Sequence, residues 1–482
     1  MATVTVPRWG LYIDGRWRDG PRTVPVLHKY RQEVLAEVVE ADELLVDEAV
    51  QAAQRALVER PLSPYRRFQI LRRAADLLSE RREEFALTIA REAGKPLKYA
   101  RVEVDRAIQT ISLSGEEAKR IHGEQVPVDA APGAEGRLAF TIRVPVGVVC
   151  AISPFNFPLN LVAHKVAPAL AAGNAVVLKP ATYTPLTSLM LAQLLEEAGL
   201  PAGYLNVVVG GGRTVGEALL RHPGIALYTF TGSPEVGERI KAATGLRRVI
   251  LELGNNSPNI VAQDANLDQA AQLLARFAYL YAGQFCISVQ RIYVEQPAYE
   301  PFLEKFVAAA RAMKLGDPED PDTDIGPLIS EDDARRVEAW VEEAVHGGAR
   351  RVLGGPRQGV LYPATVLTDV RPEMKVVCQE VFGPVASVVA CSSFEEALRQ
   401  ANDTEYGLQA GVFTRNLDRA MKAARTLRMG GVIVNDTSGF RVDLMPYGGI
   451  RRSGIGREGP RYAIEEMTDL RIVVLNPADG WG

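Results

Sequence analysis

The sequence predicts an α/β fold with two successive α/β halves, and three observations support this. Short β-branched runs alternate with helical patterns from Val146 to Gly254. A second alternation of helices and strands extends from residue 255 to about residue 452. The chain has 482 residues, which is enough for two or three substructures. Because strands that alternate with helices favour a parallel sheet covered on both faces, the first half is expected to be such a sheet.

The region from residue 40 to residue 125 has a helical pattern. Its apolar residues recur at the helix period, and basic and acidic residues fill the other face. The apolar face includes Leu71, Ala74, Leu77 and Leu78. Proline and glycine at residues 132–136 then break the pattern, and Arg137–Val144 alternates as a half-exposed strand would. A solvated helical layer and one exposed strand are therefore expected before the first half.

The first half contains five short apolar runs that predict strands. They are Val146–Ile152, Ala175–Leu178, Val207–Val209, Ala226–Phe230 and Val249–Leu253. After the second run, Thr184 and Pro185 predict a helix start with a capping hydroxyl and a proline at the first position. Gly199 predicts the end of that helix. This succession is typical of a Rossmann-like half.

A turn that contains glycine follows the fourth run. No Gly-x-Gly-x-x-Gly motif follows the first strand, where a dinucleotide fold normally carries it. Instead, Gly232, Ser233 and Gly237 stand at the entrance to a helix, where backbone N–H groups and a hydroxyl suit a pyrophosphate. The same residues can serve turn geometry alone, so both interpretations stay open at this point. Lys179 ends the second run at the carboxyl edge of the sheet, where ligands bind, although a lysine there is usually just solvated.

Cys286 lies just past an apolar helical pattern, in the glycine-flanked loop Gly283–Ser288. A thiol is a useful nucleophile only as thiolate, and a cysteine in such a loop is a candidate for exposure at the floor of a cleft. The alternative is a buried small hydrophobe. Glu252 lies upstream in an otherwise apolar run that predicts a buried strand. A carboxylate there must be satisfied or functional, because an unpaired buried charge is very costly.

Composition and charge argue against several classes of protein. The net charge of −4 gives no basic field for nucleic acid, and no apolar run is long enough to cross a bilayer. The first residues lack the segments of a signal peptide, so a cytoplasmic protein with neither a nucleic-acid nor a membrane partner is expected. The four cysteines show no paired spacing and only five histidines accompany them, which argues against a disulfide framework or a metal site.

Four motifs together resemble the aldehyde dehydrogenase superfamily. In chain order they are Pro154–Pro158, the run that contains Glu252, Gly283–Ser288 and Glu380–Val385. Four spaced motifs in the family's order are a stronger signal than any one of them alone. The resemblance covers nearly the whole chain, from the strand at Val146 to Gly454. Asp443–Tyr447 and Ser257–Pro258 look like the lactaldehyde and semialdehyde branch, which includes enzymes for small anionic aldehydes.

The resemblance implies an aldehyde dehydrogenase-like α/β fold with three parts. These are a Rossmann-like cofactor domain (1–119 and 143–254), an α/β catalytic domain (255–455), and a small β oligomerisation arm with the C-terminal segment (120–142 and 456–482). In the family, the strand at Arg137–Val144 would pair with the C-terminal strand of a neighbouring subunit, here Leu470–Leu475. The alternative is two edge strands of one subunit. The resemblance therefore implies a homodimer or homotetramer.

The resemblance also implies NAD(P)-dependent oxidation of a small aldehyde to the acid. Cys286 would attack the carbonyl, and Asn156 with the Cys286 backbone N–H would hold the oxyanion. Glu252 would activate water to hydrolyse the thioester, since members that pass the acyl group to coenzyme A lack a glutamate here. Asn156 equally suits a turn between two prolines. A non-catalytic or moonlighting member of the same fold is the alternative function.

For the cofactor, NAD or NADP, the resemblance implies contacts from a set of residues in the first half and around Glu380. They are Pro154, Phe155, Lys179, Thr182, Gly212, Gly232, Ser233, Gly237, Leu253, Glu380 and Phe382. Lys179 would hold the adenosine ribose and Glu380 the nicotinamide ribose, although Glu380 also suits a solvated surface acid. Thr182 stands where the family commonly has a glutamate, and a neutral side chain neither chelates the 2′-hydroxyl nor repels a 2′-phosphate. Asn255 stands where most members have glycine, which asparagine replaces best if φ is positive.

Two arginines are candidates for substrate recognition. By the resemblance, Arg106 lies on a helix and Arg441 in a loop that border the substrate tunnel. Because arginine holds carboxylate, phosphate, phosphonate or sulfonate groups in bidentate fashion, two converging guanidinium groups predict an anionic aldehyde, such as a semialdehyde or glyceraldehyde 3-phosphate. The alternative is two surface arginines among 55 basic residues.

Overall fold

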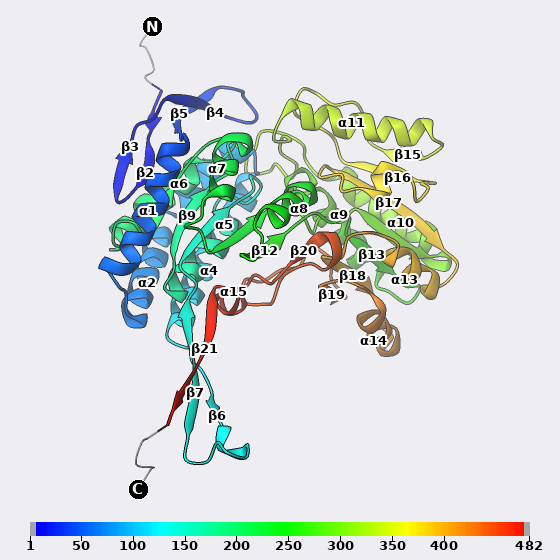
Figure 1. Cartoon of the computed structure of the whole chain (residues 1–482). Helices are drawn as coiled ribbons and strands as arrows, with labels where there is room; N and C mark the ends of the chain where they lie inside the picture. Colours follow the sequence, from blue (N-terminus) through cyan, green and yellow to red (C-terminus); the bar gives the residue numbers. More distant parts are fainter. Residues whose placement is uncertain (1–5, 477–482) are drawn as a thin grey trace.

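A computed structural model of the protein describes residues 6–476 (Figure 1). The two largest sheets lie in separate halves of the molecule, and a thin arm projects from the first half (Figure 1). The expectation for the N-terminus rests partly on residues 1–5, and the predicted C-terminal segment ends in residues 477–482. Both stretches lie outside the described residues.

Eight strands form the first sheet, in the order β20-β12-β11-β8-β9-β10-β2-β3. Its central strands run parallel: β8 (Val148–Ile152), β9 (Ala175–Lys179), β10 (Leu205–Val207), β11 (Leu227–Thr231) and β12 (Arg248–Glu252). They match the five predicted runs to within two residues at either end, which confirms the Rossmann-like half. The edge strands are antiparallel to their neighbours: β2 (Leu11–Ile13), β3 (Arg16–Arg18) and β20 (Gly454–Ile455). A small sheet beside them contains β1 (Arg8–Trp9), β4 (Arg22–Leu27) and β5 (Val34–Glu40).

Helices surround the first sheet and confirm the predicted helical layer. Those before the sheet are α1 (Glu43–Glu59), α2 (Pro64–Glu80), α3 (Arg82–Ala93) and α4 (Leu97–Ala118). Those within its strand succession are α5 (Asn160–Ala172), α6 (Leu186–Glu197), α7 (Glu217–Arg221) and α8 (Pro234–Ala243). The predicted apolar face of α2 is buried, as expected for an amphipathic helix.

The start of α6 differs from the prediction. The N-terminal cap is Pro185, and the hydroxyl of Thr184 has no hydrogen-bond partner in the described structure. The Glu92 carboxylate, from α3, instead accepts hydrogen bonds from the backbone N–H groups of Leu186 and Thr187, both at 2.9 Å. A carboxylate at this place satisfies free amides and interacts favourably with the helix dipole. The predicted Thr184 cap is therefore wrong, because a residue from another helix takes its place.

Seven strands form the second sheet, in the order β15-β16-β17-β14-β13-β18-β19, and all neighbours are parallel except β15 and β16. The strands are β13 (Pro258–Val261), β14 (Arg291–Glu295), β15 (Arg350–Leu353), β16 (Thr365–Thr368), β17 (Val385–Cys391), β18 (Gln409–Phe413) and β19 (Gly431–Val434). The helices are α9 (Leu267–Tyr279), α10 (Gln296–Arg311), α11 (Glu331–His346), α12 (Lys375–Cys378), α13 (Phe394–Asn402) and α14 (Leu417–Thr426). The second predicted alternation is confirmed.

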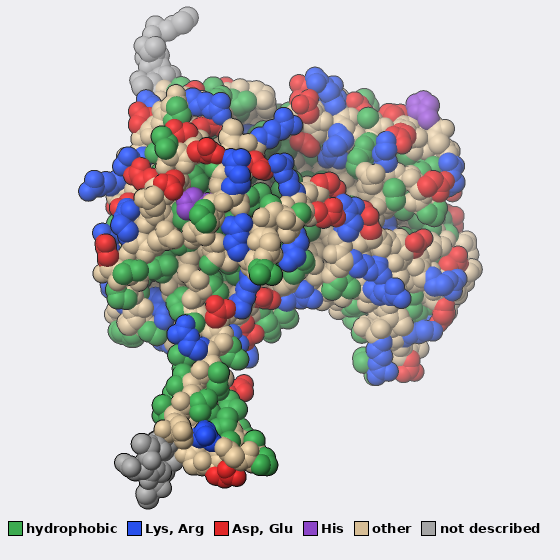
Figure 2. Space-filling model, viewed as in Figure 1, with side chains coloured by type: hydrophobic (Ala, Val, Ile, Leu, Met, Phe, Trp, Pro, Cys, Tyr) green, Lys and Arg blue, Asp and Glu red, His purple; other side chains and the backbone are tan. Residues whose placement is uncertain are grey.

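The arm is a sheet of three strands in the order β21-β7-β6. Helix α15 (Pro460–Glu466) directly precedes β21 in the chain. The strands are β6 (Gln125–Val126), β7 (Leu138–Pro145) and β21 (Thr468–Leu475). β7 confirms the predicted exposed strand, and β21 pairs with it along its whole length within the same chain. The expected pairing with the C-terminal strand of a neighbouring subunit is therefore wrong, and the alternative of two strands of one subunit is confirmed. Hydrophobic side chains remain on the surface of the arm (Figure 2), including Ile142, Leu470, Ile472 and Val474.

The described residues also bear on membranes and metals. None of the helices in residues 6–476 combines the length and the apolar character needed to cross a membrane. In the same range, no group of three or more His, Cys, Asp or Glu side chains is arranged to hold a metal ion.

Candidate active site

Two cavities meet at Cys286. A larger cavity of about 780 Å³ lies at the carboxyl ends of the central strands of the first sheet. A smaller cavity of about 220 Å³ lies beside α4 and α9. Among the described residues, Cys286 alone lines both. A thiol in this position can reach a ligand in either cavity.

Left-handed backbone shapes the loop that carries Cys286. After α9 the chain makes a 3-10 turn in which Tyr281 and Ala282 have φ angles of 51° and 54°. Gly283 follows with a φ of 67°, and a Cβ there would overlap the carbonyl oxygen of Gly383. Glycine is therefore required at this position. The prediction of a cysteine in a glycine-flanked loop after a helix is confirmed, and the Cys286 side chain is partly exposed.

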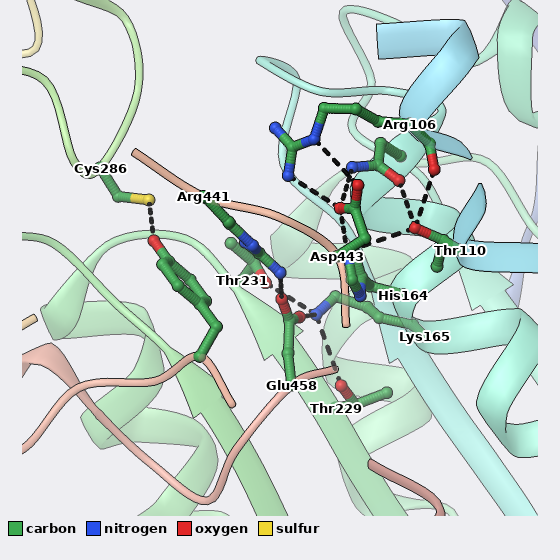
Figure 3. Close-up of polar contacts among 12 residues, drawn as sticks. Arg106, Thr110, His164, Lys165, Thr229, Thr231, Cys286, Arg441, Asp443 and Glu458 are labelled. Carbon is green, nitrogen blue, oxygen red and sulfur yellow. Dashed lines mark hydrogen bonds and ion pairs between the residues drawn. The ribbon is translucent and has the colours of Figure 1, made fainter. Parts of the chain in front are cut away.

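The Cys286 thiol has a polar partner. Its Sγ lies 3.0 Å from the hydroxyl of Tyr447, which is the dashed contact drawn from Cys286 in Figure 3. Burial raises the pKa of the thiol, and the Tyr447 hydroxyl and the Arg441 charge oppose that rise. Asn156 donates from Nδ2 to the carbonyl oxygen of Gln284, in the same loop, at 2.9 Å. Because Nδ2 carries two hydrogens, one donor remains for a ligand beside the cysteine.

Glu252 is the last residue of β12 and is 3% exposed. Neither of its carboxylate oxygens has a hydrogen-bond partner in the described structure. Burial and, second, the negative charge of Glu458 raise the pKa of Glu252 well above its ordinary value. It lines the larger cavity, as Cys286 does. A carboxyl group expected to be either satisfied or functional is not satisfied here, which favours a function.

Most of the predicted site residues line the larger cavity. They are Pro154, Phe155, Asn156, Lys179, Gly212, Gly232, Ser233, Glu252, Leu253, Cys286, Glu380 and Phe382. Phe382 adopts a left-handed φ of 48°, and its ring meets that of Phe155 edge to face at 5.8 Å between centroids. Strand ends of the first sheet and a loop of the second half thus contribute to one cavity.

The larger cavity carries donors and acceptors that fit a dinucleotide. Ser233 is the N-cap of α8, so this helix begins at the cavity wall, as a pyrophosphate site requires. Burial lowers the pKa of Lys179 to about 8, and its hydrogen bond to the carbonyl oxygen of Pro180 is long, at 3.4 Å. Burial raises the pKa of Glu380 to about 7. An amine and a carboxylate with spare hydrogen-bonding capacity fit ribose hydroxyls, and the volume is in the range of cofactor sites.

Two predicted cofactor residues, Thr182 and Gly237, do not line this cavity. The Thr182 hydroxyl donates to the carbonyl oxygen of Gly210 at 3.3 Å. A Cβ at Gly237 would lie 2.5 Å from a methyl carbon of Leu253. Gly237 therefore allows α8 to pack closely on the end of β12, which is a role in geometry.

Asn255, which stands in place of a family glycine, has a structural explanation. Its φ is not positive, so the left-handed explanation is wrong. Its Nδ2 donates to the hydroxyl of Ser257 at 2.7 Å, and its backbone N–H donates to the Glu380 carboxylate at 3.0 Å. The residue fixes the turn between β12 and β13 and orients Glu380.

Basic side chains dominate the charge of the smaller cavity. Four of its lining residues are basic (Lys95, Arg106, Arg276 and Arg441), and Glu103 is the one acidic residue among those described. Lys95 and Glu103 form a buried ion pair. The side chains of Arg106 and Arg441 are 22% and 5% exposed, so neither is a free surface arginine.

The two predicted substrate arginines each have a carboxylate partner (Figure 3). Arg106 holds Asp443 through Nε at 3.1 Å and Nη2 at 2.8 Å. Arg441 Nη2 donates to Glu458 at 3.0 Å, and Lys165 donates to the other oxygen of Glu458 at 2.9 Å. The buried Nε of Arg441 has no hydrogen-bond partner in residues 6–476. The arginines converge on one cavity, with their charges partly offset.

Two residues of the site were missed by sequence reasoning. Arg276 lines the smaller cavity from α9, and no salt bridge joins it to a carboxylate within the described part of the chain. Its charge beside Phe277, in the apolar pattern that leads to the cysteine, was the available signal. Tyr447 stands in a recognised motif, but its contact with Cys286 spans 161 positions and leaves no local signal.

Comparisons with known proteins find relatives over nearly the whole chain. A family model described as "Aldehyde dehydrogenase family" matches residues 17–473. A 3-sulfolactaldehyde dehydrogenase from Priestia aryabhattai is 53% identical over 477 residues, which cover 99% of this chain and 100% of the relative. A crystal structure of aldehyde dehydrogenase 21 from Physcomitrella patens, in complex with the reaction product succinate, has a TM-score of 0.95 and 40% identity, and covers 98% of this chain and 99% of that one. One of a glyceraldehyde-3-phosphate dehydrogenase from Methanocaldococcus jannaschii, complexed with NADP, has a TM-score of 0.91 and 39% identity, and covers 95% and 100%.

Proposed function

The chain belongs to the aldehyde dehydrogenase family, and from this membership we propose that it oxidises a small anionic aldehyde to the carboxylic acid with NAD or NADP. One observation carries the proposal. Cys286 lies between a cavity that fits a dinucleotide and a smaller cavity lined by basic side chains. In this arrangement a single thiol faces both the hydride acceptor and the aldehyde.

The proposed reaction begins at the Cys286 sulfur. The thiolate attacks the carbonyl carbon, a C–S bond forms, and the π electrons of the carbonyl move to its oxygen. The free N–H of Asn156 Nδ2 and the backbone N–H of Cys286 stabilise this oxyanion. The C–H bond of the adduct then breaks and the oxyanion re-forms the C=O bond, which leaves a thioester on Cys286. NAD or NADP, when bound in the larger cavity, would supply the acceptor for the departing hydride.

Glu252 is the proposed base for hydrolysis of the thioester. Its carboxylate takes a proton from water, the water oxygen attacks the thioester carbon, and the C–S bond breaks to release the acid and the thiolate. The carboxylate lines the cavity with Cys286 and has no competing hydrogen bond among the described residues. Its raised pKa makes the ionised carboxylate a stronger base than an ordinary glutamate.

The anionic group of the substrate is assigned to the smaller cavity. Arg276 lines this cavity without a salt bridge to a carboxylate in residues 6–476, and Arg441 keeps a buried N–H without a partner in the same range. The names of the three relatives concern a sulfonated aldehyde, a phosphorylated aldehyde and a dicarboxylate product. We therefore propose a short aldehyde that ends in a sulfonate, phosphate or carboxylate, and 3-sulfolactaldehyde is the first candidate.

Replacing Arg106 by glutamine is expected to lower kcat/KM for 3-sulfolactaldehyde by about thirtyfold, the size of one charged hydrogen bond. The variant loses a donor for the anion and leaves the Asp443 carboxylate without its bidentate partner. The value for uncharged lactaldehyde is expected to change little. Initial rates of NADH or NADPH formation with both aldehydes, in parent and variant, measure the effect.

Arg101→Gln is the matched control, because Arg101 lies on the same helix, pairs with Glu83 and lines neither cavity. Equal losses on the two aldehydes in Arg106→Gln would assign Arg106 to structure. A higher kcat/KM of the parent enzyme for lactaldehyde than for 3-sulfolactaldehyde would contradict the proposed preference for an anionic aldehyde. A parent that reduces neither NAD nor NADP with any aldehyde would favour a non-catalytic member of the same fold.

We further propose that the enzyme accepts NADP as well as NAD. Lys179 and Arg213 line the larger cavity and can pair with a 2′-phosphate, and the neutral Thr182 directly follows Ala181, which also lines it. Thr182→Glu is expected to shift the ratio of kcat/KM for NADP and NAD toward NAD by roughly tenfold, because the carboxylate repels the phosphate. Thr182→Val, which loses only the hydrogen bond to Gly210, is the control. An unchanged ratio in Thr182→Glu contradicts the proposal.

We also propose a cytoplasmic homodimer or homotetramer with the three predicted parts. The apolar surface of the arm supports association, and four free cysteines suit a reducing compartment. The proposed parts are the arm and C-terminal segment (120–142 and 456–482), the cofactor domain (1–119 and 143–254) and the catalytic domain (255–455), and the arm strand β7 continues past residue 142 to Pro145. Sedimentation velocity on the full chain tests the assembly, and a monomer at micromolar concentration contradicts it.

A further inference from the structure

We propose that the Tyr447 hydroxyl is a further catalytic group, which holds the Cys286 sulfur as thiolate; this role rests on the proposed function of Cys286. The hydroxyl oxygen lies 3.0 Å from Sγ. In residues 6–476, no other side chain makes a hydrogen bond to that sulfur. Cys286 lines both cavities, and its sulfur is the proposed reacting atom. The Tyr447 hydroxyl therefore contacts the reacting atom directly.

A phenol hydroxyl can follow the thiol through its ionisation. It accepts a hydrogen bond from S–H and, once that proton has left to solvent, donates its own O–H to the negative sulfur. Hydrogen bonds with an ionised partner are about twice as strong as neutral ones. The contact between Tyr447 and Cys286 therefore favours the thiolate and opposes burial, which raises the pKa of the thiol.

Tyr447 is held at both its backbone and its ring. Its backbone N–H donates to the Glu458 carbonyl oxygen at 3.1 Å, and Glu458 N–H donates back to the Tyr447 carbonyl oxygen at 2.7 Å. The Arg441 guanidinium carbon lies 3.6 Å from the centroid of the ring, and the Glu458 carboxylate holds that guanidinium. These contacts hold the ring and its hydroxyl beside the sulfur, with the Arg441 charge over the face of the ring.

The hydrogen bond acts mainly on the free thiolate. As the C–S bond to an aldehyde forms, negative charge leaves the Cys286 sulfur for the carbonyl oxygen, where Asn156 is the proposed donor. Tyr447 therefore influences the ionisation of the thiol more than the attack that follows. Its loss should change the pH at which Cys286 ionises.

Alkylation of Cys286 by iodoacetamide in Tyr447→Phe, without aldehyde or cofactor, tests this. The thiolate sulfur forms a bond to carbon and displaces iodide, so the rate follows the thiolate fraction. We expect the rate at neutral pH to fall about tenfold or more, and the rate–pH curve to move up by about one pH unit or more. The rate at the high-pH plateau is expected to persist. Phenylalanine keeps the ring against which Arg441 packs.

Two references accompany the measurement. Peptide mass mapping follows Cys378 in the same sample, an exposed thiol that makes no hydrogen bond to Tyr447. Tyr279→Phe is the matched control, because it removes a buried hydroxyl bound to the Thr365 carbonyl oxygen at 3.1 Å and lines neither cavity. The Cys286 curve of this control is expected to coincide with that of the parent.

A Tyr447→Phe curve that coincides with the parent's overturns the inference. An equal loss of rate at every pH also overturns it, since that pattern marks a structural role. In both cases aldehyde oxidation by the variant would leave the proposed function standing. Failure of the parent to oxidise any aldehyde would instead refute the proposed function, and the shift in the Cys286 titration would still be readable.

Discussion

Cys286→Ala is expected to abolish aldehyde oxidation, by a factor on the order of 10⁴ or more, because only the thiolate can form the thioester. Cofactor binding is expected to survive. In the described structure no other thiol lines either cavity, so nothing replaces the lost sulfur. Formation of NADH or NADPH measures the first effect, and calorimetric titration of the cofactor measures the second.

Cys378→Ala is the control for this variant, because it removes an exposed thiol that lines neither cavity. Its activity is expected to match that of the parent. Oxidation that persists in Cys286→Ala within a factor of ten of the parent would remove the thioester route. Loss of cofactor binding in the same variant would indicate that the loop is disrupted, since alanine removes only the sulfur atom.

Local pattern was sufficient for the elements that carry the site. Alternation of apolar runs and helical patterns predicted the five parallel strands, and the carboxyl edge of that sheet is where Lys179 and Glu252 meet the larger cavity. The loop of Cys286 was also predicted from a local pattern, an apolar helical pattern followed by a glycine-flanked segment. In each case the decisive signal lies within a few neighbouring residues, such as a single acid in an apolar run.

Contacts between distant segments could not be predicted in this way. Arg106 and Asp443 pair across 337 positions, and this partner offsets the charge that the sequence alone assigned to the substrate. Glu92 caps α6 from 94 positions away and replaces the predicted hydroxyl cap of Thr184. Because a side chain can be satisfied by any segment the fold brings near it, residue type predicts a need and not the partner that meets it.

The arm shows the same limit in a strand. The alternation at Arg137–Val144 predicted an exposed strand, but an edge strand pairs with whichever edge lies beside it. Here β21 of the same chain takes that position, and the register joins Thr468 to Pro145 and Leu475 to Leu138. The pattern of one strand carries no information on whether its partner belongs to the same chain.

Glu252→Gln is expected to stop the reaction after its first half. The amide cannot take a proton from water, and loss of a general base costs about 10² to 10⁴ in rate. Hydride transfer precedes this step, so the variant is expected to give a burst of reduced cofactor close to one equivalent per subunit and then to stall. Stopped-flow absorbance measures the burst, and mass spectrometry of the quenched protein locates the acyl group on Cys286.

The pH dependence of turnover gives a second test of Glu252. A base must be deprotonated to act, so the steady-state rate of the parent is expected to rise with pH through the raised pKa of this carboxyl group. The residual turnover of Glu252→Gln is expected to lack that rise. Added hydroxylamine, which attacks a thioester without help from a base, should restore turnover in Glu252→Gln and not in Cys286→Ala. Undiminished turnover in Glu252→Gln would mean that another group activates the water. A variant that gives no burst and that hydroxylamine does not restore would mean that Glu252 acts before the thioester forms.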